Sequence, residues 1–239
     1  MNDVKKLVVL MALGTALAGC DNASEPLAFT PEMASFSNEF DFDPLRGPVK
    51  AFTQTLVNDK GEVSKRVAGS LSAEGCFDTL EMHDLDASTS VSLVLDANYY
   101  RDAETLQQKV KLQGKCQLAE LPAAGIVWET DDNGFVVAAH GKEMEVKYRY
   151  DTEGYPLGKT TVAAGQHLAV TATPSKDKRK KLDYTAVSSL NDKPVGSVKQ
   201  TCDYDRHNNP LSCEMVIKDE RATPAVTRKY TIENSIDYY

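Results

Sequence analysis

Hydrophobic positions divide the chain into two unlike parts. Residues 7–18 form one apolar run behind Lys5 and Lys6, whereas from about residue 36 the apolar positions come in short segments. The run is shorter than the ~20 residues that a permanent membrane-spanning helix requires. A basic stretch followed by a short apolar run is instead typical of an export signal peptide.

The pattern after residue 36 is typical of antiparallel β-structure. Short segments with β-branched and aromatic residues alternate with clusters of Asp, Asn and Gly, most clearly at residues 148–157 and 202–211. In such hairpins an Asp or Asn caps its own turn, a Gly or Asn supplies a positive φ, and tyrosines pack on the flanking strands. We therefore predict a mainly β fold, an antiparallel β-meander of hairpins with Asp/Asn-Gly turns and at most one or two short helices.

One segment departs from this strand pattern. Residues 101–108 contain helix formers, with acids early and Lys109 following, which favours a short helix. The alternation from Val110 toward Cys116 favours a strand instead. Both interpretations remain open at this point.

The sequence Leu17-Ala18-Gly19-Cys20 resembles the lipobox of bacterial lipoproteins. The resemblance implies that residues 1–19 are removed as a signal peptide and that Cys20 carries an S-diacylglycerol and an N-palmitoyl group. Residues 20–35, with two prolines among small and polar residues, are predicted to form a lipidated flexible tether. Residues 36–239 then form a β-rich periplasmic domain.

Asp21 directly follows the predicted lipidated cysteine. An Asp in this place resembles the signal that retains enterobacterial lipoproteins in the inner membrane. We therefore predict a protein anchored by lipid to the inner (cell) membrane on its periplasmic face, with the outer membrane as the less favoured alternative. After Cys20 no apolar run reaches the ~18 residues of a spanning helix, so the expected membrane partner is reached through lipid alone.

Four further cysteines, an even number in an exported chain, indicate two disulfides. If Tyr204 faces Leu211 across a hairpin, then Cys202 faces Cys213 at a separation that a disulfide accepts. The two cysteines that remain, Cys76 and Cys116, are then paired by exclusion. The four cysteines are Cys76, Cys116, Cys202 and Cys213.

The charge balance argues against one class of partner. The chain has 27 Lys and Arg against 35 Asp and Glu, a net charge of −8, whereas nucleic-acid binding requires clustered cations. Residues 174–181 are locally basic and could attract anionic headgroups, although a solvated hairpin tip is the favoured interpretation. We predict no nucleic-acid partner.

No catalytic or cofactor motif stands out, and we predict no enzyme activity, no metal and no cofactor. A zinc site built from Cys202, His207 and Cys213 is less favoured than a disulfide. The aromatic residues could line a sugar or peptide groove, but sheet packing is the simpler interpretation. They are Tyr99, Tyr100, Trp128, Tyr148, Tyr150, Tyr155, Tyr238 and Tyr239.

Three functional hypotheses follow. The favoured one is a non-enzymatic binding or accessory protein whose open meander exposes strand edges to an unknown protein, peptide or glycan. A periplasmic hydrolase with a dispersed active site is the alternative. A structural surface protein without a specific ligand is the third.

Long segments of the chain resemble the enterobacterial YnfC lipoprotein family. The resemblance implies a lipid-anchored envelope protein and assigns a role to Cys20 alone. It rests on residues 29–50, 95–105 and 183–187, on Trp-Glu-Thr-Asp-Asp-Asn-Gly-Phe at 128–135, and on Ile-Asp-Tyr-Tyr at 236–239.

Overall fold

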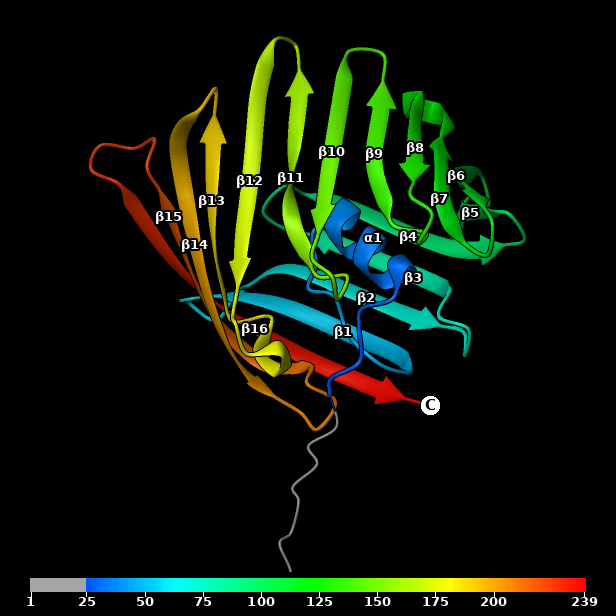
Figure 1. Ribbon diagram of the computed structural model, residues 1–239, viewed down its shortest axis with the longest axis horizontal. Helices are drawn as coiled ribbons and strands as arrows, with labels where there is room; N and C mark the ends of the chain where they lie inside the picture. The colour runs from blue at the N-terminus through cyan, green and yellow to red at the C-terminus, as the bar shows by residue number, and fades with distance from the viewer. Residues whose placement is uncertain (1–24) are drawn as a thin grey trace, which may run out of the picture.

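The described residues form a closed antiparallel barrel of sixteen strands (Figure 1). The structure, a computed structural model, describes residues 25–239. Each strand pairs with the next in sequence, and β16 pairs with β1 to complete the ring. The predictions that fall on the signal peptide, Cys20 and Asp21 lie outside the described residues.

The helical elements are short and few. They are α1 (Pro31–Phe40) and the 3-10 turns η1 (Pro122–Ala124) and η2 (Lys178–Lys180). The strands are β1 (Val49–Asn58), β2 (Val63–Leu71), β3 (Phe77–Asp84), β4 (Thr89–Asp96), β5 (Tyr99–Asp102), β6 (Gln108–Gln113), β7 (Gln117–Leu121), β8 (Ile126–Thr130), β9 (Val136–Gly141), β10 (Met144–Tyr150), β11 (Pro156–Ala163), β12 (Gln166–Pro174), β13 (Tyr184–Leu190), β14 (Lys193–Tyr204), β15 (Pro210–Asp219) and β16 (Val226–Tyr238).

The predicted antiparallel meander is confirmed, but the expectation that it is open is wrong. Strands β1 and β16 pair along most of their length, with Thr53 opposite Ser235 and Leu56 opposite Ile232. Closure gives every described strand two hydrogen-bonded neighbours. An edge for strand addition, the basis of the predicted peptide partner, is therefore absent from residues 25–239.

Three hairpin turns share the local chemistry expected of them. In each, the Oδ1 of an Asp accepts hydrogen bonds from the backbone N–H groups two and four residues later. A residue with positive φ then reverses the chain. The acids are Asp131, Asp151 and Asp205, and the positive-φ residues are Gly134, Gly154 and Asn208.

The helix considered at residues 101–108 does not form. Strands β5 and β6 flank a turn there, and the Asp102 carboxylate caps that turn by accepting hydrogen bonds from the N–H and hydroxyl of Thr105. The early acid therefore stabilises a turn rather than a helix N-terminus.

Both cysteine pairs have disulfide geometry. Their Sγ atoms lie 2.16 Å apart in Cys76–Cys116 and 2.10 Å apart in Cys202–Cys213. The predicted opposition of Cys202 and Cys213 is confirmed, whereas Tyr204 faces Pro210 and not Leu211. A bulge after Asp203 shifts the register at that point.

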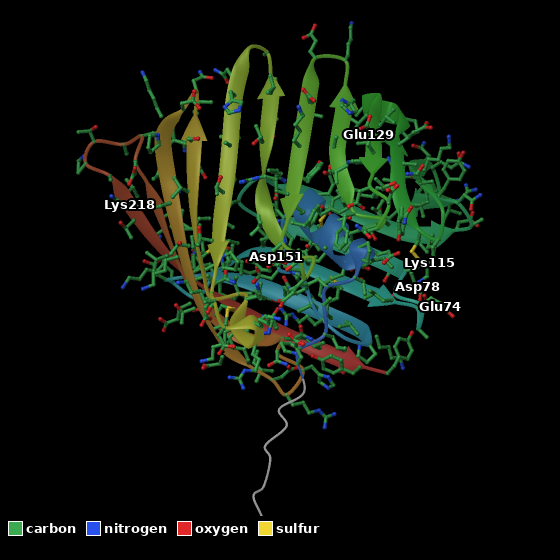
Figure 2. The ribbon with its side chains drawn as sticks, in the orientation of Figure 1. Glu74, Asp78, Lys115, Glu129, Asp151 and Lys218 are labelled. Carbon is green, nitrogen blue, oxygen red and sulfur yellow. A yellow bond between two sulfur atoms is a disulfide. The ribbon has the colours of Figure 1, made fainter. Side chains whose placement is uncertain are left out.

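The Cys76–Cys116 disulfide ties two turns together at one rim of the barrel. Glu74, Asp78 and Lys115 gather beside it (Figure 2). The Lys115 ammonium donates to the carbonyl oxygen of Glu74. Loops far apart in sequence are thus fixed to each other by one covalent bond and one charge-assisted hydrogen bond.

Helix α1 lies inside the barrel, between the wall of β1–β4 and the wall of β8–β12 (Figure 1). Its residues from Glu32 to Asn38 are all buried. The Phe36 ring lies 4.7 Å from that of Phe77 on β3 and 5.6 Å from that of Tyr100 on β5. On the opposite wall, the Ser35 hydroxyl accepts a hydrogen bond from Val136 N–H of β9.

The predicted tether is therefore too long. Phe29 is buried, Thr30 is the N-cap of α1, and the helix begins at Pro31. The polar composition that indicates a tether also suits a helix start, because a hydroxyl cap followed by Pro and an acid is the usual N-terminal pattern. Residues 29–35 belong to the folded unit.

The barrel wall complements the C-terminus of α1, which has no basic residue in its own last turn. Lys65 of β2 donates to the carbonyl oxygen of Asp41 at 2.7 Å. Lys159 of β11 donates to the carbonyl oxygen of Asn38 and to the Asp41 carboxylate, both at 2.9 Å. Two cations from separate strands thus satisfy the exposed carbonyl end of the helix dipole.

Phe36→Ala removes the principal aromatic contact between helix and barrel. Phe36 is 1% exposed and packs on rings from two strands. We expect a loss of about 3–5 kcal/mol in the free energy of unfolding, measured by urea denaturation. Val162→Ala, at an exposed position of β11, is the control and should change it by less than ~0.5 kcal/mol. A loss below 1 kcal/mol for Phe36→Ala would contradict the burial of α1.

Candidate ligand-binding cavity

A cavity of about 300 Å³ lies in the barrel next to the C-terminal end of α1. Helix α1 fills the part of the lumen against β3, β5 and β9, and the cavity occupies the part bounded by β1, β2 and β11–β16. Its wall is mostly aliphatic, with side chains from seven strands. These side chains are Leu56, Val67, Val170, Ala172, Ala186, Val198, Met215 and Ile232.

Asp43 supplies a carboxylate at the polar end of this cavity. Its backbone is held by Gln54 of β1, whose amide accepts from Asp43 N–H at 3.0 Å and donates to the Asp43 carbonyl at 2.8 Å. Gln200 of β14 donates from Nε2 to Asp43 Oδ2 at 2.9 Å. Two glutamines from different strands therefore fix both the backbone and the carboxylate.

The Asp43 carboxylate has no cation beside it among the described residues. Its side chain faces the cavity rather than bulk solvent, and this desolvation raises the pKa of Asp43 to about 6, against the smaller lowering by the Gln200 hydrogen bond. Lys65, which lines the cavity, and Lys159 are both bonded to the end of α1. An unpaired carboxylate in an apolar cavity is unfavourable for stability and is typical of a functional site.

Two tyrosines share the polar end with this carboxylate. Tyr155 and Tyr184 line the cavity, and neither hydroxyl is hydrogen-bonded to another described residue. Burial raises the pKa of both phenols, and the negative charge of Asp43 adds to the effect. Both phenols are therefore neutral at physiological pH, with oxygens that can accept a hydrogen bond from a ligand.

A second buried charge, Arg46, pairs with an acid and an aromatic ring, although none of its guanidinium nitrogens donates a hydrogen bond to a described residue. Its guanidinium lies 4.3 Å over the ring of Phe29 and 3.7 Å from the Glu153 carboxylate. The Asn209 side chain bonds both the N–H and the carbonyl of Arg46, at 2.7 and 2.9 Å. These contacts connect the segment before β1 to the turn that contains Glu153 and to the turn that contains Asn209.

The aromatic groove, the less favoured interpretation of these residues, is not formed as such by the described side chains. Tyr100, Trp128 and Tyr148 are buried in the core around α1, which agrees with the sheet-packing interpretation. Tyr155 alone of that set lines the cavity.

The other candidates lie apart from the cavity. Cys202 and Cys213 are bonded to each other and so are not free to hold zinc, and the His207 ring stacks on Tyr238 at 4.0 Å. Within residues 25–239 no group of three His, Cys, Asp or Glu side chains is arranged to hold a metal ion. Ser90 Oγ lies 3.0 Å from His83 Nδ1, but this pair is exposed and contributes to none of the cavity wall.

The basic loop at residues 174–181 forms ion pairs with acids elsewhere in the fold. Lys181 donates to the Asp151 carboxylate at 2.7 Å, near the centre of the view in Figure 2. Lys178 pairs with Glu25 and Glu153. The loop therefore neutralises neighbouring acids.

No helix within the described part of the chain has the length and apolar character needed to cross a membrane.

Sequence reasoning missed Asp43. The residue lies between α1 and β1, outside any strand, and its only local signal is an acid between Phe42 and Pro44 in a segment that becomes buried. Its role depends on Gln54 and Gln200, which only the closed barrel brings to it.

Asp43→Asn should stabilise the protein at neutral pH. Because folding raises the pKa of Asp43 from ~3.9 in an unfolded chain to about 6, the unfolded state loses its proton first, and native stability falls as pH rises across this interval. We expect the variant to be more stable than wild type by roughly 1–3 kcal/mol at pH 7.5 and nearly equal at pH 4.

Urea denaturation at the two pH values tests this expectation. Asp203→Asn, the same change at an exposed position of β14, is the matched control and should show no such pH-dependent gain. Equal stabilities of wild type and Asp43→Asn at pH 7.5 would contradict an ionised, unpaired Asp43.

Comparison with known proteins identifies the relatives of the chain. Residues 4–239 match the family described as "Uncharacterised protein family (UPF0257)". Proteins of Salmonella dublin and Salmonella typhi, both named UPF0257 lipoprotein YnfC, are 66% identical over 236 residues, which are 99% of this chain and 100% of theirs. Among solved structures, a porin-like protein from Bacteroides uniformis has 10% identity and a TM-score of 0.45, over 80% of this chain and 98% of that one. The match extends over nearly the whole sequence, confirms the resemblance to the YnfC lipoproteins, and shows that the chain belongs to the UPF0257 family.

Proposed function

We propose that the chain is a lipid-anchored protein of the cell envelope that binds a small amphipathic molecule inside its barrel. The observation that carries this proposal is the cavity itself, an aliphatic wall with one fixed carboxylate at its end. Such a combination of apolar lining and a few placed polar groups is typical of small-molecule sites.

The size of the cavity limits the ligand. A volume of about 300 Å³ lies at the lower end of the ~300–1,000 Å³ range of ligand sites. It corresponds to about ten water molecules at ~30 Å³ each, so a short alkyl chain with a small head fits and a glycan or folded peptide does not. Closure of the barrel also favours a ligand held in the lumen, because a closed sheet offers no free edge to which a partner strand could add.

A binding role is better supported than hydrolysis. Ser37 lines the cavity, but its hydroxyl donates to the carbonyl of Ala34 in the same helix. No histidine is among the lining residues, so a Ser–His pair is not assembled there. Asp41 also lines the cavity, but it is largely exposed and paired with Lys159 rather than forming a carboxylate pair with Asp43. The hydrolase remains the alternative.

The anchor follows from the lipobox at Cys20 and from the lipoprotein names of the relatives. Asp21 favours the inner membrane, with the barrel on the periplasmic side. Three acyl chains would hold the protein durably, whereas one would bind only reversibly.

Mass spectrometry of the purified native protein tests the anchor. We expect a chain that begins at Cys20, carries a diacylglyceryl and an acyl group, and fractionates with inner-membrane vesicles. Cys20→Ser should abolish acylation and retain the uncleaved signal. A soluble, unacylated wild-type protein would contradict the anchor, and recovery with outer-membrane porins would contradict the assigned membrane.

Binding of 1-octanol, measured by isothermal titration calorimetry, tests the cavity. Ala172→Leu and Ala186→Leu each place additional carbon atoms in it and should weaken binding at least tenfold with little change in thermal stability, because the added atoms occupy empty space. Thr173→Leu, next to Ala172 but exposed, is the matched control and should bind as wild type does. If Ala172→Leu and Ala186→Leu both bind 1-octanol as tightly as wild type does, the ligand binds outside this cavity.

A further inference from the structure

We propose that the ligand of the lumenal cavity is a primary amine with an alkyl chain, and that its ammonium group binds Asp43. This inference rests on the proposed function, since it requires that the cavity hold a ligand at all. It adds the chemical class of the head group, which follows from the polar end of the cavity.

The Asp43 carboxylate has an incomplete set of hydrogen-bond partners. Gln200 donates to Oδ2, and Oδ1 accepts from no described residue. Gln200 itself is 1% exposed, and its Oε1 lacks a partner. The Asp43 carboxylate therefore keeps one oxygen free for a ligand at the cavity, and an acceptor of this kind is stabilised by a donor, above all by a cationic donor.

Residues 25–239 do not supply a cation to this carboxylate. Lys65 and Lys159 approach the cavity, but their ammonium groups donate to the carbonyls that end α1. Arg46 lies against Phe29 and Glu153. The cations that could neutralise Asp43 are thus committed to other contacts, and the positive charge is left for the ligand.

The groups that share the cavity with the carboxylate also suit a cationic head group. Tyr155 and Tyr184 present neutral hydroxyls and aromatic rings to the same cavity. Phenol oxygens accept hydrogen bonds from an ammonium, and ring faces attract a cation. A carboxylate head would instead meet the charge of Asp43 without a compensating cation, so fatty acids are disfavoured.

Three ligands that share an eight-carbon chain and differ only in head group distinguish the contribution of the head group to affinity from that of the tail. Octylamine, 1-octanol and octanoate are titrated at pH 7.5 into the wild-type protein, Asp43→Asn and Asp203→Asn, with calorimetry as the readout. We expect octylamine to bind wild type at least tenfold more tightly than octanol, and octanoate to bind most weakly. Asp43→Asn should lower octylamine affinity to the octanol level and leave octanol unchanged, whereas Asp203→Asn should keep the wild-type order.

The outcomes distinguish the two proposals. Equal affinities of the three ligands for wild type, or an octylamine preference that survives Asp43→Asn, would overturn the amine assignment and leave lumenal binding intact. Tighter binding of octanoate than of octylamine would also overturn the amine assignment. Failure of all three to bind wild type at millimolar concentration would overturn the lumenal function on which the assignment rests.

Discussion

The two lysines that meet the end of α1 are the interaction on which the interior depends. Lys65 and Lys159 come from β2 and β11, and both donate to the last carbonyls of the helix. Without them those carbonyls would have no cationic partner, because the helix has no basic residue in its last turn. The same contacts hold both ammonium groups at the helix end, and neither group pairs with Asp43.

Local features of the fold were accessible from the sequence, and long-range ones were not. The Asp-capped turns, the strands and the Cys202–Cys213 pair depend on residues a few positions apart, so composition and register predict them. Closure depends on β1 meeting β16, the two strands farthest apart in sequence order. Alternating polarity predicts two faces for each strand but does not state whether the last strand returns to the first.

The cavity could not be predicted for the same reason. Val67, Ala186 and Ile232 are ordinary inward-facing strand residues until closure makes them neighbours. Asp43 follows no periodic pattern, since it lies in the connection from helix to strand. Phe29 and Phe36 carry no sequence signal that distinguishes a helix inside a barrel from a polar connection, because their burial depends on a wall built later in the chain.

The order of the strands has a consequence for biogenesis. Helix α1 precedes every strand, yet its enclosure requires β16, so the lumen has no sealed wall until the final hairpin has docked. Contacts of such large sequence separation form slowly, because the loop they close is long. The side of the lumen that β1 and β16 complete therefore stays open to water until this last pairing forms, although the aromatic contacts of α1 to β3 and β5 do not depend on it.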